Sequence, residues 1–264
     1  MRAIFAIKLA AICRFSLTKT EMDAASLPII VTRAEPGASE TGARLRVMGL
    51  TPVLAPMLTL VPREHEPLPN LENISGLVFT SANGVRVFAG RSQARELPAW
   101  CVGPATAAAA RTEGFSQVHE STGNALDLAR YISANTQIDD RPLLHIANRA
   151  AAGTLKSELE AAGFRVIFAP LYEMRPAKAL PSAVDQMLAG NQTAILLIHS
   201  QKGASAFAAL MPPRSGSSLL VIAISDLACE PLKVLPLRSI HIAEAPNEDG
   251  LFSALHAGIA TLSA

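Results

Sequence analysis

Short apolar runs rich in β-branched residues alternate with amphipathic or alanine-rich runs along most of this chain. From Leu27 onward this alternation predicts strands that are each followed by a helix. Strands connected through helices form parallel sheets covered on both faces, so the pattern predicts an α/β fold with two five-stranded sheets. The predicted strands are 28–33, 51–55, 75–79, 99–103, 116–119, 142–147, 164–169, 193–199, 219–223 and 238–242.

An internal repeat indicates two similar halves. The stretch GLTPVLAPMLTLVP at 49–62 matches GFRVIFAPLYEMRP at 163–176 in its Gly, its Ala-Pro and its final Pro, without gaps. Further along, GLVFTSANGVRVFAG parallels AILLIHSQKGASAFAAL. The repeat ends in MLTLVP and LYEMRP, where prolines discourage helix and remove ladder hydrogen bonds. We therefore expect stiff, extended linkers at these two places.

Composition restricts the classes of partner. The chain has 264 residues, of which 50% are apolar and 17% charged, so it can bury a large core. Its net charge of +1 argues against a nucleic-acid-binding surface. The cysteines, Cys13, Cys101 and Cys229, have neither metal-ligand nor redox spacing, which indicates reduced thiols and a cytoplasmic location. The six histidines have no ligand-like spacing either, so no metal site is expected.

The first 26 residues differ from the rest of the chain. Four basic residues interrupt their apolar run, which is too short to cross a bilayer, so no membrane segment is expected. The stretch could be a targeting peptide, but no clean small-x-small cleavage site accompanies it. It could equally be a disordered tail, or an over-extended start ahead of Met22.

Small and polar residues follow several predicted strands. In open parallel sheets, ligands bind beyond the carboxyl ends of the strands, where helix N-termini and free backbone N–H groups favour anions. The same hydroxyls could instead only cap their helices. The candidate anion-binding residues at these strand ends are Thr80, Ser81, Ala82, Asn83, Gly103, Thr106, Ser200, Gln201 and Lys202.

The order of these motifs resembles that of the uroporphyrinogen-III synthase family. The motifs are VTR at 31–33, GLTPV running into AP-M, VFTSANGV, CVGPATAAAA, and a second GFRV followed by PLYE, within residues 27–264. The resemblance implies two flavodoxin-like domains with parallel sheets, joined by a two-stranded interdomain linker. It divides the chain into an N-terminal extension at 1–26, a discontinuous domain at 27–57 plus 177–264, a second domain at 64–170, and linkers at 58–63 and 171–176.

The resemblance also implies an activity. The family cyclises hydroxymethylbilane, a linear tetrapyrrole polycarboxylate, to uroporphyrinogen III with inversion of ring D and loss of water, a step of haem and porphyrin biosynthesis. No cofactor is implied, and the expected protein is a monomer. By similarity, Tyr172 is the acid that helps water leave, although it could instead be a tyrosine packed beside a linker. Arg33, Arg149 and Ser225 join the substrate-binding set.

Some positions depart from the family pattern. In AISDLACE, Ser225 and Ala228 stand where a Gly and a Thr are common, and Asp226 would repel a nearby carboxylate. Asn148 likewise stands where a Gly is common, and His199 could donate to substrate or lie hydrogen-bonded beneath the loop. Two other functions therefore stay open: a two-lobed anion-binding module without chemistry, and a degenerate synthase-like domain that makes protein contacts.

Overall fold

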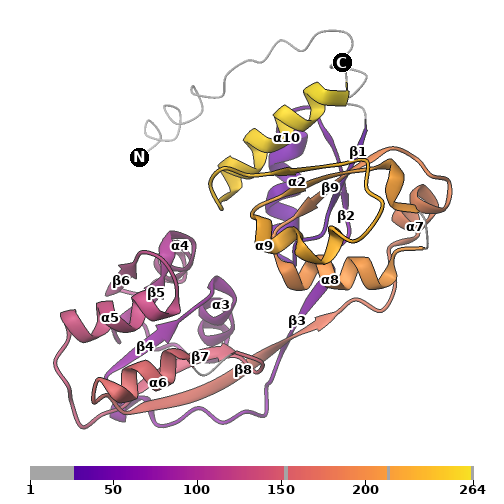
Figure 1. Cartoon of the computed structure of the whole chain (residues 1–264). Helices are drawn as coiled ribbons and strands as arrows, with labels where there is room; N and C mark the ends of the chain where they lie inside the picture. Colours follow the sequence, from indigo (N-terminus) through magenta and orange to yellow (C-terminus); the bar gives the residue numbers. More distant parts are fainter. Residues whose placement is uncertain (1–26, 152–153, 213–214, 263–264) are drawn as a thin grey trace, which may run out of the picture. The chain divides into compact units, whose positions relative to one another are not determined.

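The computed structural model of the chain describes residues 27–151, 154–212 and 215–262. These residues form two compact units (Figure 1). Unit 1 takes in the described residues of 27–59 and 176–262, and unit 2 those of 60–175. Each unit contains one sheet with helices on its faces, which confirms the predicted α/β fold with two largely parallel sheets. Residues 1–26 and Cys13, on which the targeting and start-site hypotheses depend, lie outside the described residues.

Unit 1 is built on a parallel sheet of order β11-β10-β9-β1-β2. Its central strands are wholly apolar and buried, as expected when helices cover both faces. Ile29 and Val31 pack against one set of helices, whereas Ile30 between them packs against the other, because side chains alternate along a strand. The strands are β1 (Pro28–Val31), β2 (Thr51–Leu54), β9 (Ala194–Ile198), β10 (Leu219–Ala223) and β11 (Ser239–Ile242).

The helices of unit 1 cover its sheet in two layers. Leu45 of α2 and Leu255 of α10 belong to the core on one face, and Val184 of α7 and Phe207 of α8 to the core on the other. Figure 1 shows α2 and α10 beside each other on the same face. The helices are α2 (Gly37–Val47), α7 (Ser182–Ala189), α8 (Gln201–Leu210), α9 (Asp226–Cys229) and α10 (Glu248–Leu262), with 3-10 turns η2 (Ser215–Ser218) and η3 (Glu230–Leu232).

Unit 2 is built on a six-stranded sheet of order β3-β8-β7-β4-β5-β6, parallel from β8 to β6. The prediction of five strands was wrong for this sheet, because β3 adds to its edge by pairing with β8. Phe79 packs with α3 and α4 on one face, whereas Trp100 packs with α5 and α6 on the other. The strands are β3 (Leu58–Pro62), β4 (Gly76–Phe79), β5 (Ala99–Val102), β6 (Val118–Ser121), β7 (Leu143–Asn148) and β8 (Val166–Pro176). The helices are α3 (Ala82–Arg91), α4 (Gly103–Thr112), α5 (Ala125–Asn135) and α6 (Thr154–Ala161), with a 3-10 turn η1 (Leu71–Asn73).

The two segments expected to be extended linkers are strands that pair with each other, in agreement with the two-stranded connection that the family resemblance implies. The segment at 58–62 forms β3, and β8 continues to Pro176, well past the predicted end at 169. The N–H of Ala177 donates to the carbonyl of Met57 at 2.9 Å, and the N–H of Arg63 donates to that of Leu171 at 2.8 Å. The two segments therefore run antiparallel. The prolines do not prevent this pairing because Pro62 and Pro176 stand at strand ends.

Candidate functional site

Serine side chains cap the helices that follow three strands. Ser81 Oγ accepts the N–H of Asn83 at 3.2 Å, Ser200 Oγ that of Gly203 at 3.1 Å, and Ser225 Oγ that of Ala228 at 3.2 Å. Each serine is in extended backbone at the N-cap position, as an N-cap requires. Capping uses a lone pair of the hydroxyl oxygen and leaves the hydroxyl hydrogen to donate to another group.

Packing of the start of α3 against β7 accounts for the small residues in the loop after β4. Thr80, Ala82 and Asn83 are half-buried at the start of α3. A Cβ at Gly84 would lie 3.2 Å from the carbonyl oxygen of Ile146 on β7, so the helix start approaches the sheet closely. Small side chains in this loop therefore serve α3–β7 packing as well as any ligand.

Tyr172 of β8 lies beside this loop in unit 2. Its side chain belongs to the core that also holds Phe79, and only 3% of the residue is exposed. Burial raises the pKa of Tyr172, and hydrogen bonds with the Ser81 side chain and the Asn148 backbone partly offset that rise. The phenol is therefore protonated at neutral pH, as a proton donor must be.

Arg149 follows β7 and is tied to β8. Its backbone N–H donates to the carbonyl of Tyr172 at 2.8 Å. Its side chain is 65% exposed, with Nη1 3.8 Å from Oε2 of Glu173. Glu173 also bonds Arg175, so one carboxylate is shared by two guanidinium groups.

The start of α4 differs from the serine-capped helices. Gly103 has a φ of +69°, a conformation that other residues adopt at a cost, and no atom lies within 4 Å of where its Cβ would be. Glycine is therefore favoured here by the backbone conformation of the turn, and not by close packing of the described residues around the Cβ position. Thr106 lies on the buried face of α4 and is 4% exposed.

In unit 1, Arg33 lies in a cluster that the sequence did not reveal. Its Nη1 donates to Oε2 of Glu248 at 3.1 Å, and Thr41 donates to Oε1 of the same carboxylate at 2.6 Å. Nε2 of His199 lies 3.5 Å from Oε2 of Glu248, too long for a good hydrogen bond. Burial raises the pKa of Glu248, but its contacts with His199, Thr41 and Arg33 lower it further, to about 2. Glu248 is therefore ionised at neutral pH.

His199 itself has an exposed side-chain fraction of 7%, and neither ring nitrogen makes a hydrogen bond to a described residue. Its Nε2 has only the long 3.5 Å contact with Glu248, so the interpretation of His199 as a histidine satisfied beneath the loop stays a prediction. The donor hypothesis for His199 also stays a prediction.

The remaining sequence-predicted residues of unit 1 lie at two helix starts. Gln201 and Lys202 are exposed in the first turn of α8. Beyond Ser225, the carboxylate of Asp226 binds Lys233 at 2.7 Å, and Lys233 also binds Glu230 at 2.8 Å. One lysine is thus shared by two carboxylates, so the pairing offsets only part of the negative charge that the sequence suggested would repel substrate.

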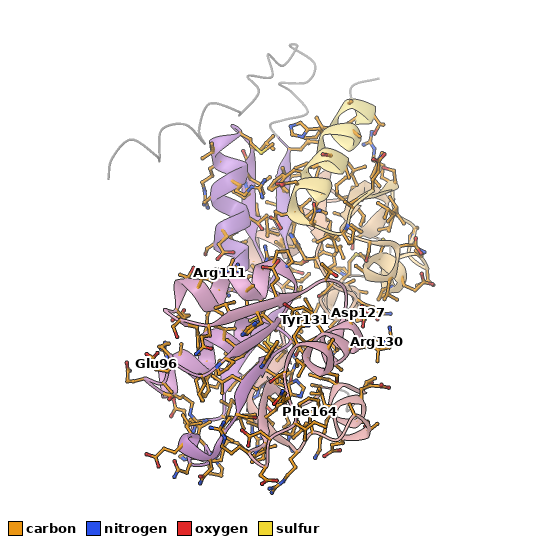
Figure 2. The ribbon with its side chains drawn as sticks, turned by 90° about the vertical axis from the view of Figure 1, so that its left-hand side faces the viewer. Glu96, Arg111, Asp127, Arg130, Tyr131 and Phe164 are labelled. Carbon is orange, nitrogen blue, oxygen red and sulfur yellow. The ribbon has the colours of Figure 1, made fainter. Side chains whose placement is uncertain are left out.

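Two hollows in unit 2 lie away from these loops. One, of about 430 Å³, is lined by the later turns of α5 and α6, including Arg130 and Glu158. Figure 2 shows Arg130 on α5 with Asp127 and Tyr131. The other, of about 390 Å³, is lined by residues just before β7 and β8, including Pro142 and Arg165. Both lie toward the amino ends of the strands, the edge opposite the candidate residues.

The described residues contain no group of three or more His, Cys, Asp or Glu side chains that could hold a metal ion. Within the same residues, no helix is both long and apolar enough to cross a membrane. Cys101 and Cys229 are buried, free thiols, and burial raises the pKa of Cys101 to about 12.

Comparison with known proteins gives one family and one fold. A family model described as uroporphyrinogen-III synthase HemD matches residues 39–253. Uroporphyrinogen-III synthetase from Helicobacter pylori 26695 is 16% identical with a TM-score of 0.61, over 88% of this chain and 99% of that one. A mutant uroporphyrinogen III synthase from the extremely thermophilic bacterium Thermus thermophilus is 12% identical with a TM-score of 0.52, over 89% of this chain and 100% of that one. No curated protein sequence matches the chain significantly.

Proposed function

This chain belongs to the uroporphyrinogen-III synthase family, and we propose that its polar strand ends bind the carboxylates of the family's substrate. The chain is a lyase that cyclises hydroxymethylbilane to uroporphyrinogen III with inversion of ring D and loss of water, in haem biosynthesis. The observation that carries this conclusion is the family match over 39–253, since it includes every strand-end motif except VTR at 31–33. Units 1 and 2 would be the family's two domains.

The reaction is chiefly a problem of positioning. Loss of the terminal hydroxyl gives an azafulvene that closes unaided to the unrotated ring, so the enzyme must favour attack at the substituted carbon through a spiro intermediate. Well-oriented groups can lower such a barrier by up to about 7 to 11 kcal/mol. Binding the carboxylate arms through backbone N–H groups, serine hydroxyls and arginines supplies that orientation without a strongly basic surface.

In unit 2, the substrate-binding residues would be Thr80, Ser81, Ala82, Asn83, Gly103, Thr106 and Arg149. In unit 1 they would be Arg33, Ser200, Gln201, Lys202 and Ser225. The exposed side chains of Arg149 and Lys202 support this assignment most directly. The proposal needs no cofactor.

Tyr172 would donate the proton that leaves with water. A positioned acid contributes about 100- to 10,000-fold to such a step. Its bond to Ser81 at the strand end supports this role, whereas its raised pKa makes the phenol a weaker acid. Its 3% exposure supports the other interpretation, that Tyr172 only packs beside the linker. The kinetics of Tyr172→Phe distinguish the acid from the packing residue.

We further propose that the protein acts as a monomer in the cytoplasm, without a nucleic-acid or membrane partner. The free thiols of Cys101 and Cys229 are compatible with a reducing compartment. Sedimentation of the purified chain measures the oligomeric state.

One assay tests the activity. Freshly prepared hydroxymethylbilane is added to the full chain, and the macrocycle is oxidised and separated by isomer. Isomer III at a rate proportional to enzyme concentration is the expected result. Isomer I alone, the spontaneous product, would leave only the binding module or the degenerate domain, and equilibrium binding of a linear tetrapyrrole polycarboxylate would then distinguish those two.

A further inference from the structure

We propose that Glu248 is a positioning residue, which holds the guanidinium of Arg33 in one orientation to receive a carboxylate of hydroxymethylbilane. The inference rests on the proposed function and adds to it a residue that lies far along the chain from every candidate motif. All the groups involved belong to unit 1.

The bonds of Glu248 use both of its oxygens. Oε2 accepts from Nη1 of Arg33 at 3.1 Å, and Oε1 accepts from Oγ1 of Thr41 at 2.6 Å. Nη1 of Arg33 also lies 3.5 Å from the Thr41 hydroxyl, so the three groups form a closed triangle. Glu248 begins α10, Thr41 lies in α2 and Arg33 follows β1, so three elements fix the geometry.

The backbone of α2 leaves a space for the arginine. A Cβ on Gly37 would overlap Nε of Arg33 and lie 2.7 Å from its Cζ. The side chain therefore runs directly over the first turn of α2, in the space that the missing Cβ of Gly37 leaves. In this position the guanidinium lies between the first turn of α2 and the carboxylate of Glu248.

The remaining donors of Arg33 are available to an anion. Both of its side-chain hydrogen bonds within the described residues use Nη1. The side chain is 37% exposed, against 21% for Glu248. An arginine held through one nitrogen with its other N–H groups unused suits a carboxylate, which two parallel N–H groups can bind. A partner carboxylate such as Glu248 keeps the fork from rotating, so less freedom is lost on binding.

A purely structural ion pair is the competing explanation, since the same bonds join α2 to α10. That explanation predicts a loss of stability without a specific effect on substrate affinity. A neighbouring pair offers a matched control, because Arg44 of α2 binds Asp249 of α10 at 2.7 Å and also joins these helices.

The experiment is a double-mutant cycle on the full chain with hydroxymethylbilane, measuring KM and kcat for isomer III. We expect Arg33→Ala to raise KM about tenfold, the equivalent of one charged hydrogen bond. Glu248→Gln should raise KM by a similar factor with little change in kcat, and the double variant should be no worse than Arg33→Ala alone. Asp249→Asn, the control, should keep the wild-type KM.

The outcomes separate the hypotheses. The inference is overturned if folded Glu248→Gln has the wild-type KM, or if the two substitutions have effects that multiply in the double variant. In either case the proposed function stands as long as the unsubstituted protein produces isomer III. If the unsubstituted protein produces isomer I alone, both the proposed function and the inference are overturned. If circular dichroism shows that Glu248→Gln does not fold, Thr41→Val takes its place, because it removes the donor to Oε1 of Glu248 together with the weak acceptor of Arg33 and keeps the size of the side chain. A raised KM supports the inference and an unchanged KM overturns it.

Discussion

Oε2 of Glu173 lies 3.8 Å from Nη1 of Arg149, while the same carboxylate binds Arg175. Glu173 is 21% exposed and both arginines are more than 60% exposed, so on the proposed site a substrate carboxylate would compete with Glu173 for the guanidinium of Arg149. Glu173→Gln should therefore lower KM for hydroxymethylbilane by about two- to fivefold, the range of an exposed ion pair. Steady-state kinetics at low ionic strength measure this effect, which salt should weaken. Glu160→Gln, which removes an exposed pair with Lys156 on α6, is the control and should not change KM.

The Tyr172 hydroxyl is the group whose removal tests the proposed acid. Tyr172→Phe should lower kcat by about 100-fold, the lower end of a general acid's contribution. Loss of its bonds to Ser81 and Asn148 should cost about 1 kcal/mol in the free energy of unfolding. Tyr131→Phe is the matched control, because Tyr131 on α5 is the other of the two tyrosines and packs against Trp100. An unchanged kcat in Tyr172→Phe would assign Tyr172 to packing alone.

His145 should make unit 2 sensitive to acid. It is 2% exposed on β7, next to Phe168, and neither ring nitrogen has a hydrogen-bond partner among the described residues. Burial lowers its pKa from 6.5 to about 4. In the unfolded chain the imidazole of His145 binds a proton below pH 6.5, whereas in the folded chain it binds one only near pH 4. The free energy of unfolding therefore falls as the pH drops from 6.5 to 4. At about 1.4 kcal/mol per pH unit, the loss approaches 3 kcal/mol.

His145→Leu should remove this dependence and raise the free energy of unfolding at pH 7 by about 1 kcal/mol, since two unbonded polar atoms leave the core. Fluorescence of Trp100, the single tryptophan, reports unfolding of unit 2. His65→Gln, at an exposed site, should keep the wild-type slope between pH 6.5 and 4. An equally steep slope in His145→Leu would assign the acid sensitivity to another group.

A side chain at Gly103 should lower stability although its surroundings are open. Its φ of +69° should make Gly103→Ala cost about 1 kcal/mol of stability, although a Cβ would meet no atom within 4 Å. Gly90 in α3 is equally open but lacks a positive φ, so Gly90→Ala should be neutral or stabilising by up to about 1 kcal/mol. Urea unfolding followed by Trp100 fluorescence compares the two variants, and equal effects would contradict the conformational explanation.

The strands could be predicted because their cause is local. Apolar runs such as Ile195–Leu197 are buried on both faces, and the serines after them cap helices, which is a signal within a few residues. The proline-bounded pattern of 58–62 predicted only an extended segment, and its pairing with β8 was expected from the family resemblance instead. Residue patterns alone do not show which distant segments pair.

Glu248 could not be assigned from the sequence because its partners are remote. Asn247 and the acids after it mark a helix start, and Asn247 Oδ1 does accept the N–H of Gly250 at 2.8 Å. Yet Arg33 is 215 positions away and Thr41 is 207 positions away. No spacing rule connects residues that only a folded sheet brings together.

The insertion of residues 60–175 between β2 and the rest of unit 1 has a consequence for the growing chain on the ribosome. β1 and β2 are translated early, but β9, the neighbour of β1 on its other side, emerges only after the whole of unit 2. All strands of unit 2 are therefore synthesised before β9, and the apolar edge of β1 lacks its neighbouring strand until translation passes residue 198.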